Sequence, residues 1–177
     1  VHEDDSTLAD NSLGNLPEVY IGEASAPVVI EEYTDLQCGM AKYWWNEILP
    51  QIKQEYIETG KVKIVFKDYP LGFREEEANL AEASHCAFEQ NKYEEYVNGI
   101  YTMWENGEVD ATTVAQNIGL DVTSFSSCLD SGKYSEVVRR NFDQGNSLGV
   151  QGTPTFFVNG EIIEGAQPFE TFQAKIN

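Results

Sequence analysis

Residues 34–45 read TDLQCGMAKYWW and join two stretches with different hydrophobic periods. The run Val28-Val29-Ile30 before them is typical of a buried strand, and the residues after them repeat with the period of a helix. Cys38 is therefore predicted to stand where a strand ends and a helix begins, and the free N–H groups there favour a thiolate. A thiolate is the nucleophile of thiol–disulfide exchange, whereas a lone cysteine can also be simply a small buried apolar residue. The apolar positions of the predicted helix are Tyr43, Trp44, Ile48, Leu49, Ile52 and Tyr56.

A second informative stretch, residues 152–157, reads GTPTFF. Residues 26–38 resemble the first strand and the approach to the active site of DsbA-like thiol oxidoreductases. Residues 149–160 resemble the cis-proline loop and hairpin of the same family, and the resemblance runs from about Val19 to the C-terminus. It implies that Cys38 is the attacking thiol of a protein disulfide oxidoreductase. One departure is large, because the family pattern is Cys-x-x-Cys and Ala41 stands at the position of the second, resolving cysteine.

Length and termini set the broad class of the protein. The chain has 177 residues, enough for one domain with a buried core, or for one domain that carries an insertion. No segment approaches about 18 consecutive apolar residues, so no transmembrane helix is expected. The acidic start Val1-His2-Glu3-Asp4-Asp5 is not a signal peptide, so either the protein is cytosolic or a targeting segment was removed before Val1. The absence of an initial methionine favours removal.

The charge is strongly unbalanced, with 30 acidic and 11 basic residues and a net charge of -19. This excludes generic nucleic-acid binding, which requires a basic surface, and argues against binding to anionic membranes. A solvated acidic shell that keeps the protein soluble explains such a charge. Adaptation to high salt also explains it, because salt screens the repulsion between surface carboxylates.

The order of periodic segments predicts an α/β fold. Residues 1–16 are acidic and polar and are expected to form a flexible lead-in, such as the remnant of a tether. Strands are expected at 18–21, 28–33 and 63–69, with a helix from Cys38 to Tyr56 that Pro50 should kink. After about residue 73 only helical patterns appear, until strands return at 155–158 and 161–164 around Asn159-Gly160, a strong hairpin signature.

Five helices are expected between residues 73 and 148, and a last helix at 169–176 should have Pro168 at its first position. This order, together with the resemblance, predicts a thioredoxin fold with an inserted helical subdomain. Residues 17–72 would form its first part, residues 73–148 the insertion, and residues 149–177 its second part. The aromatic face of the helix at 93–104 is interpreted as core.

The resemblance places Pro154 after a cis peptide bond, in a loop that faces Cys38. An extended substrate polypeptide could then pair with the backbone beside it, whereas an ordinary trans proline in a turn is the alternative. The substrate-binding residues implied by the resemblance are Gly39, Met40, Gly152, Thr153 and Pro154.

The resemblance also implies two supporting charges. Glu32 matches a buried acid that relays protons under the active site, and Lys67 on the neighbouring strand matches its usual partner. Glu31 and Glu32 must point to opposite faces of the strand. The alternative is that Glu32, Lys67 or both are exposed charges at the ends of their strands.

Besides Cys38, the chain has Cys86 and Cys128, both in predicted helices of the insertion. Some relatives carry a second disulfide between these helices, so a Cys86–Cys128 disulfide is expected, with two free buried cysteines as the alternative. No Cys/His cluster has the spacing of zinc ligands, and neither a metal nor an organic cofactor is expected.

These features favour an extracytoplasmic enzyme, periplasmic or at the cell surface, that forms a mixed disulfide between Cys38 and unfolded or extended cysteine-containing polypeptides. The resemblance adds a quinone-linked membrane protein as redox partner. Ala41 is interpreted as an engineered substitution that traps mixed disulfides, because alanine preserves the helix and deletes only the resolving sulfur. Two alternatives stay open: a non-redox module that binds peptides, in which Ala41 would be a natural loss of activity, and a monothiol enzyme that uses glutathione.

Overall fold

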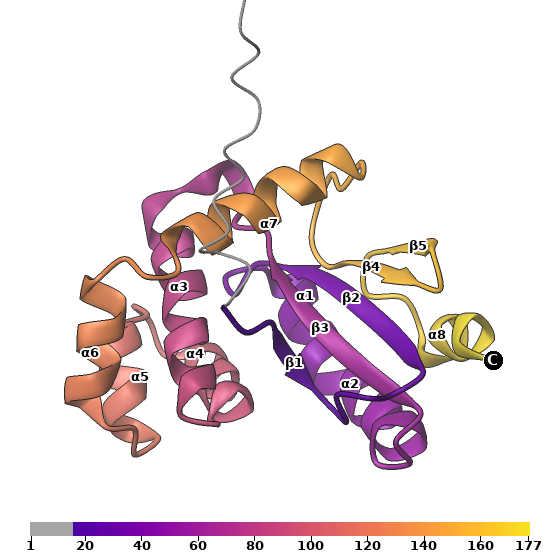
Figure 1. The fold of residues 1–177 in the computed structure, drawn as a ribbon, viewed down its shortest axis with the longest axis horizontal. Coiled ribbons are helices and arrows are strands. Elements are labelled where there is room, and N and C mark those ends of the chain that lie inside the picture. The colour runs from indigo at the N-terminus through magenta and orange to yellow at the C-terminus, as the bar shows by residue number, and fades with distance from the viewer. Residues whose placement is uncertain (1–15) are drawn as a thin grey trace, which may run out of the picture.

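A mixed sheet of five strands forms the centre of the computed structural model, which describes residues 16–177 (Figure 1). The strands are β1 (Val19–Ile21), β2 (Val28–Thr34), β3 (Val62–Asp68), β4 (Thr155–Val158) and β5 (Glu161–Glu164), in the spatial order β1-β3-β2-β4-β5. Only β2 and β3 are parallel, as expected for two strands joined by a helix. The lead-in predicted for residues 1–16 lies, except for Leu16, outside the described residues.

The first helical segment runs from Gly39 to Ile57 and changes its winding on the way. It comprises α1 (Gly39–Tyr43), the wider π turn η2 (Trp44–Ile48), α2 (Leu49–Ile52) and a second π turn, η3 (Lys53–Ile57). Pro50 lies just after the first π turn. Proline has no N–H to donate to the preceding turn, and π turns are a common way for a helix to absorb such an interruption.

The predicted helical block between β3 and β4 is present. It contains η4 (Leu71–Phe73), α3 (Glu75–Glu89), α4 (Tyr93–Glu105), α5 (Ala111–Asn117), α6 (Val122–Asp130) and α7 (Ser135–Ser147). Asp110 caps α5 as expected, since its carboxylate accepts the N–H of Thr113 at 2.8 Å. The last helix, α8, spans Phe169–Ile176. Pro168 is its N-cap in extended conformation rather than its first helical residue, which corrects the sequence expectation by one position.

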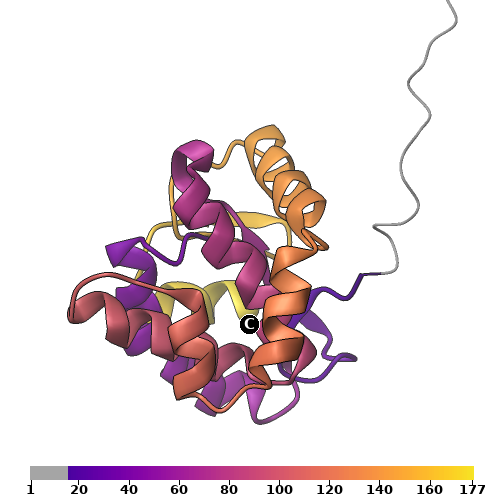
Figure 2. The same cartoon turned by 90° about the vertical axis from the view of Figure 1, so that its left-hand side faces the viewer.

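One continuous apolar core joins the sheet to the helical block. Trp45 packs on Phe66 of β3 with ring centroids 5.8 Å apart, and Phe66 packs on Tyr93 of α4 at 4.8 Å. Trp44 is fully buried against Phe156 of β4. Figures 1 and 2 show α1 and α2 on one face of the sheet and the helices of the block beside it. The predicted aromatic face of α4 therefore forms core, as expected.

Helix α7 packs on the sheet through a smaller cluster around Tyr33, Tyr69 and Val150. Gly145 makes this approach possible, because a Cβ there would lie 2.8 Å from the Tyr69 ring and 3.0 Å from the Tyr33 ring. A side chain at that position would force the helix away from the end of β3.

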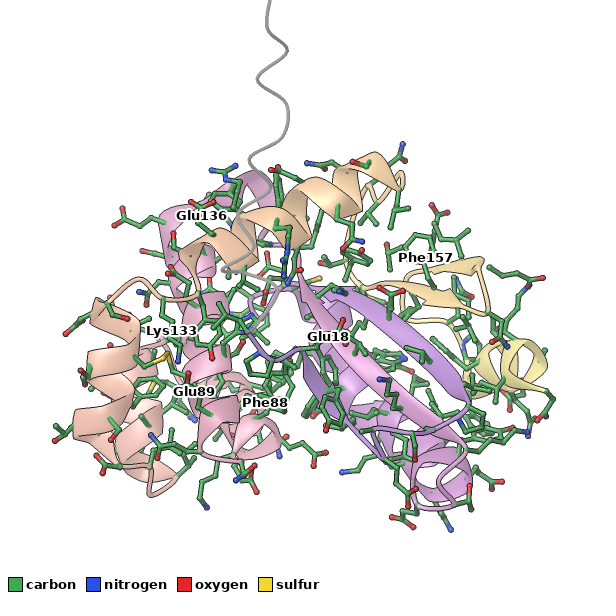
Figure 3. The ribbon with its side chains drawn as sticks, in the orientation of Figure 1. Glu18, Phe88, Glu89, Lys133, Glu136 and Phe157 are labelled. Carbon is green, nitrogen blue, oxygen red and sulfur yellow. A yellow bond between two sulfur atoms is a disulfide. The ribbon has the colours of Figure 1, made fainter. Side chains whose placement is uncertain are left out.

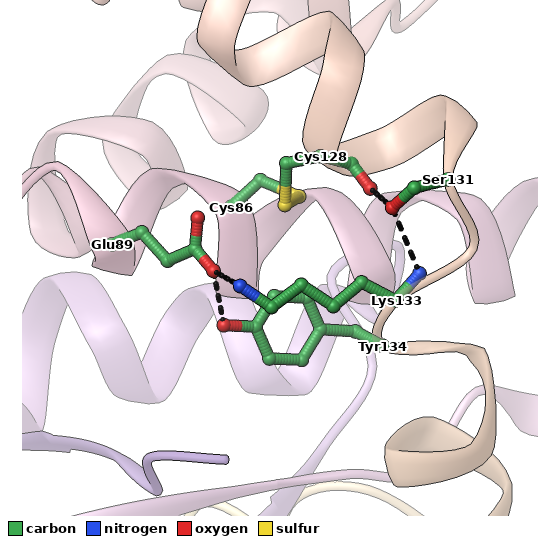
Figure 4. Close-up of polar contacts among 6 residues, drawn as sticks. All are labelled: Cys86, Glu89, Cys128, Ser131, Lys133 and Tyr134. Carbon is green, nitrogen blue, oxygen red and sulfur yellow. Dashed lines mark hydrogen bonds and ion pairs between the residues drawn. A yellow bond between two sulfur atoms is a disulfide. The ribbon is translucent and has the colours of Figure 1, made fainter.

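Cys86 of α3 and Cys128 of α6 form the disulfide that the resemblance implies (Figure 4). Beside it, the Glu89 carboxylate accepts the Tyr134 hydroxyl at 2.6 Å and pairs with Lys133. The disulfide therefore holds α6 against α3 within the helical block. Cys38 is the free thiol among the described residues.

Replacing both disulfide cysteines by alanine is expected to lower the free energy of unfolding by about 4 kcal/mol. The bond closes a loop with a sequence separation of 42 residues, and the chain-entropy treatment of such a loop gives that magnitude. Urea unfolding of the variant and of the original chain, with and without reductant, measures the difference. Finding three free thiols in the denatured, unreduced original chain would contradict the disulfide.

Candidate active site

Cys38 is the N-cap of α1, with extended backbone angles of φ -101° and ψ 123°. Its N–H donates to the Asp35 carbonyl at 3.1 Å and its carbonyl accepts the N–H of Lys42 at 3.0 Å, so a turn leads directly into the helix. The side chain is partly exposed. The strand-to-helix position predicted from the sequence is therefore correct, and Cys38 directly precedes the free N–H groups of the first helical turn.

The Thr153–Pro154 loop lies against Cys38. The peptide bond before Pro154 is cis, as expected, and the Cys38 thiol donates to the Thr153 carbonyl at an Sγ–O distance of 3.3 Å. Two of the residues implied in substrate binding, Gly39 and Gly152, have open space where a Cβ would project. Met40 is 53% exposed, which leaves an apolar side chain beside the thiol for a partner to cover.

Ala41 is 1% exposed, three residues after Cys38 in the same helix. Residues three apart in a helix lie on neighbouring positions of one face. The structure therefore puts the small side chain of Ala41 where the sequence pattern puts the resolving sulfur, inside the protein rather than at its surface.

Glu32 is 2% exposed in the middle of the sheet, opposite Phe66 of β3 and Phe156 of β4. Burial raises the pKa of Glu32 from 4.5 to about 8, and a hydrogen bond with Thr34 only partly opposes this. Its Oε2 atom has no hydrogen-bond partner within residues 16–177. The predicted burial of Glu32 is thus confirmed, and its carboxyl group is expected to stay protonated at neutral pH.

Lys67 does not pair with Glu32, which corrects the sequence expectation. In the β2–β3 register Lys67 lies opposite Tyr33, so its side chain is on the sheet face of Glu31 and away from Glu32. The Lys67 amine lies 3.5 Å from Glu18 and 4.0 Å from Glu31. Figure 3 labels Glu18, and also Phe157, which pairs with Glu31 and shares this face.

Sequence reasoning missed the contribution of α4 to this site. The Tyr101 phenol has a pKa well above its ordinary value, first because it is buried and then because groups that become negative when they ionise lie near it. Those groups are Glu32, Cys38 and Asp35. The pKa of Tyr93 is raised in the same way, first by burial and then by the nearby Glu32 carboxyl group. The aromatic face of the insertion therefore lies near the ionisable groups of the site as well as forming core.

Asp68 and His85 form a buried polar pair at the end of β3. His85 Nε2 lies 2.7 Å from Asp68 Oδ2, and Asn141 donates to the same oxygen at 2.8 Å. This pair links α3 and α7 to the sheet.

Across residues 16–177, no three His, Cys, Asp or Glu side chains come together in a way that could hold a metal ion. None of the helices described there is long and apolar enough to cross a membrane.

Comparisons with known proteins agree with this geometry. The family model described as thioredoxin matches residues 15–177. The probable disulfide bond formation protein D of Bacillus anthracis is 30% identical over 153 residues, which cover 80% of this chain and 70% of that protein. A putative protein-disulfide oxidoreductase of Rickettsia felis is 25% identical over 150 residues, 81% of this chain and 53% of that protein.

Two solved structures share the fold. Wolbachia pipientis alpha-DsbA1 superimposes with a TM-score of 0.75 at 23% identity and covers 94% of both chains. BdbD from Bacillus subtilis, in its oxidised form, gives a TM-score of 0.71 at 20% identity and covers 90% of both chains. The chain therefore belongs to the thioredoxin family, and within that family it is a DsbA-like thiol–disulfide oxidoreductase.

Proposed function

We propose that this chain exchanges disulfides with extracytoplasmic polypeptides through a mixed disulfide at Cys38. The observation that carries the proposal is the free thiol at the start of α1, 3.3 Å from the carbonyl of Thr153 in the cis-proline loop. In the exchange step the Cys38 thiolate attacks one sulfur of a substrate disulfide. A Cys38–substrate bond forms, the substrate S–S bond breaks, and the other substrate sulfur leaves as a thiolate.

An extended polypeptide is the substrate that suits this surface. Gly39 and Gly152 leave the backbone on both sides of Cys38 open, and Thr153 and Pro154 lead directly into β4. A cysteine peptide could add its backbone along that loop while its sulfur approaches Cys38, and Met40 would contact its side chains. Unfolded chains present such extended segments, whereas folded proteins rarely do.

Ala41 limits the reaction to its first step. Without a second thiol in the site, the mixed disulfide has no internal nucleophile to resolve it. We infer that Ala41 replaces a cysteine of a parent protein, in which a disulfide between Cys38 and that cysteine would oxidise a substrate dithiol. One substrate thiolate would attack Cys38 and release the second active-site thiol, and the other substrate thiolate would then displace Cys38 as the substrate disulfide forms. A quinone-linked membrane protein would then reoxidise that parent, and Glu32 would relay protons below the site with Tyr101 nearby.

An oxidising, extracytoplasmic compartment fits two further features. The Cys86–Cys128 disulfide persists only where thiols are not kept reduced. The net charge of -19 suits a protein that works in high salt or depends on repulsion to stay soluble. Periplasmic and cell-surface locations both satisfy these conditions.

Replacing Cys38 by serine is expected to abolish covalent capture of peptides. The probe is a cysteine peptide activated as its thionitrobenzoate mixed disulfide, which releases a coloured thiolate when Cys38 attacks the peptide sulfur. Mass spectrometry should find one peptide per chain, and none on the Cys38→Ser variant. Equal, non-covalent binding of the peptide by both proteins would instead favour the non-redox peptide module. Capture of glutathione but not of peptides would favour the monothiol enzyme.

A further inference from the structure

Asp35 has a buried carboxylate that joins two separate parts of the chain. Its Oδ1 atom accepts the N–H of Gln37 at 2.8 Å, and its Oδ2 atom accepts the N–H of Leu71 at 2.9 Å. Gln37 belongs to the turn that carries Cys38, whereas Leu71 begins η4, the root of the helical insertion. Asp35 is 4% exposed, and both of its bonds are partly buried.

We propose that Asp35 is a positioning residue, which aligns Cys38 with the cis-proline loop by tying the turn before α1 to the root of the insertion. The proposal rests on the proposed exchange reaction at Cys38 and adds a residue to it. Three bonds meet at Asp35, because its backbone carbonyl also accepts the N–H of Cys38 at 3.1 Å. A shift of the Asp35 backbone would therefore move the sulfur directly.

The charge of Asp35 argues for positioning rather than for activation of the thiol. A carboxylate near a sulfur opposes formation of the thiolate, so it does not help to generate the nucleophile. Burial raises the pKa of Asp35, and its bonds with the N–H groups of Leu71 and Gln37 oppose that rise. What this carboxylate supplies is two acceptor oxygens, a pair that no neutral side chain of the same shape offers.

The loop that contains Leu71, at the other end of the Asp35 connection, is itself held in place. The N–H of Tyr69 donates to the Thr34 carbonyl at 2.8 Å, which continues the β2–β3 pairing up to the two loops. Leu71 packs against the cluster of Tyr33, Tyr69 and Val150 below α7. Asp35 thus connects the turn at Cys38 to residues anchored in the core, which is how an active-site group is kept within catalytic tolerance.

The test compares two reactions of Cys38 in the full chain and in the Asp35→Asn variant. Alkylation by iodoacetamide reports mainly how much thiolate is present, whereas exchange with the activated cysteine peptide also requires alignment with the cis-proline loop. Asparagine keeps one acceptor oxygen and turns an N–H donor toward the other backbone N–H. The ratio of the exchange rate to the alkylation rate is expected to fall about tenfold, because misplacement by a fraction of an ångström is costly.

Three further variants separate the causes. Glu75→Gln removes one exposed negative charge from the same root of the insertion and should leave the ratio unchanged. Leu71→Pro removes both the Leu71 side chain and the N–H that Asp35 accepts, whereas Leu71→Ala removes the side chain and keeps the N–H. The ratio should therefore fall further in Leu71→Pro than in Leu71→Ala, even if Asp35→Asn does not fold.

The outcomes are distinct. If the original chain itself fails to exchange with the peptide, the proposed function is wrong, whatever Asp35 does. If the original chain exchanges but the ratio is unchanged in Asp35→Asn and Leu71→Pro, Asp35 is only structural and the positioning role is overturned. If alkylation and exchange both become faster by the same factor in Asp35→Asn, Asp35 acts only through its charge. That result also overturns the positioning role.

Discussion

Replacing Ala41 by cysteine is expected to turn a chain that stops at the mixed disulfide into a catalyst of net dithiol oxidation. Residues 38 and 41 are one helical turn apart, and the Cys38 sulfur is already held against the Thr153 carbonyl. When the Cys38 thiolate attacks glutathione disulfide, one glutathione leaves as a thiolate, and the second thiol would then attack the Cys38–glutathione disulfide within the same site and release the other glutathione. The disulfide formed between the two active-site cysteines is then reduced by two thiols of the substrate, which leave joined as a new disulfide. Intramolecular attack of this kind has a large effective concentration, so turnover should rise at least about a hundredfold.

The measurement is the rate at which a reduced, unfolded protein gains disulfides, with glutathione disulfide as the terminal oxidant. That oxidant takes the two electrons that each new substrate disulfide releases. Ala41→Ser is the matched control, because serine has nearly the size of cysteine but cannot form a disulfide. If the correctly folded Ala41→Cys protein remains as inactive as Ala41→Ser, the enzyme hypothesis is wrong, and the non-redox peptide-binding module becomes the better explanation.

Much of the fold could be predicted because it depends on local patterns. Asn159-Gly160 between two apolar runs gives the β4–β5 hairpin, and Asp110 marks the start of α5 where its carboxylate caps the helix. The Cys86–Cys128 disulfide came from the family resemblance rather than from spacing. In each case the information lies within a few residues or in a pattern shared by relatives.

The sequence-based expectations that failed concern contacts that depend on how helices and strands pack against one another. The alternation along β2 correctly separates Glu31 from Glu32, but only the β2–β3 register shows that Lys67 is on the side of Glu31. Likewise, the aromatic period of α4 predicts a buried face without saying what that face covers. That Tyr101 approaches the ionisable groups of the site follows from the docking of the insertion, which no local pattern encodes.

Glu32 should make the protein less stable as the pH rises from about 4.5 to about 8, the two values of its pKa in the unfolded and folded chain. Below that range both states hold the proton, so the folded state has no penalty. Within it, the unfolded chain releases the proton while the buried carboxyl retains it, and stability falls with pH. The loss over the whole range is on the order of 5 kcal/mol, at 1.36 kcal/mol per unit of pKa shift.

A Glu32→Gln variant isolates this effect, because glutamine has the shape of the protonated acid and does not titrate. Urea unfolding of both proteins between pH 4 and pH 9 should give a difference that grows in favour of the variant as the pH rises. Glu31→Gln is the matched control on the opposite face of β2 and should keep the slope of the original chain. The burial of Oε2 without a partner is the reason for expecting so large a slope. A difference curve for Glu32→Gln that is flat across this range would mean that Glu32 ionises as freely in the folded protein as in the unfolded chain, and a group of that kind could not serve the proposed proton relay.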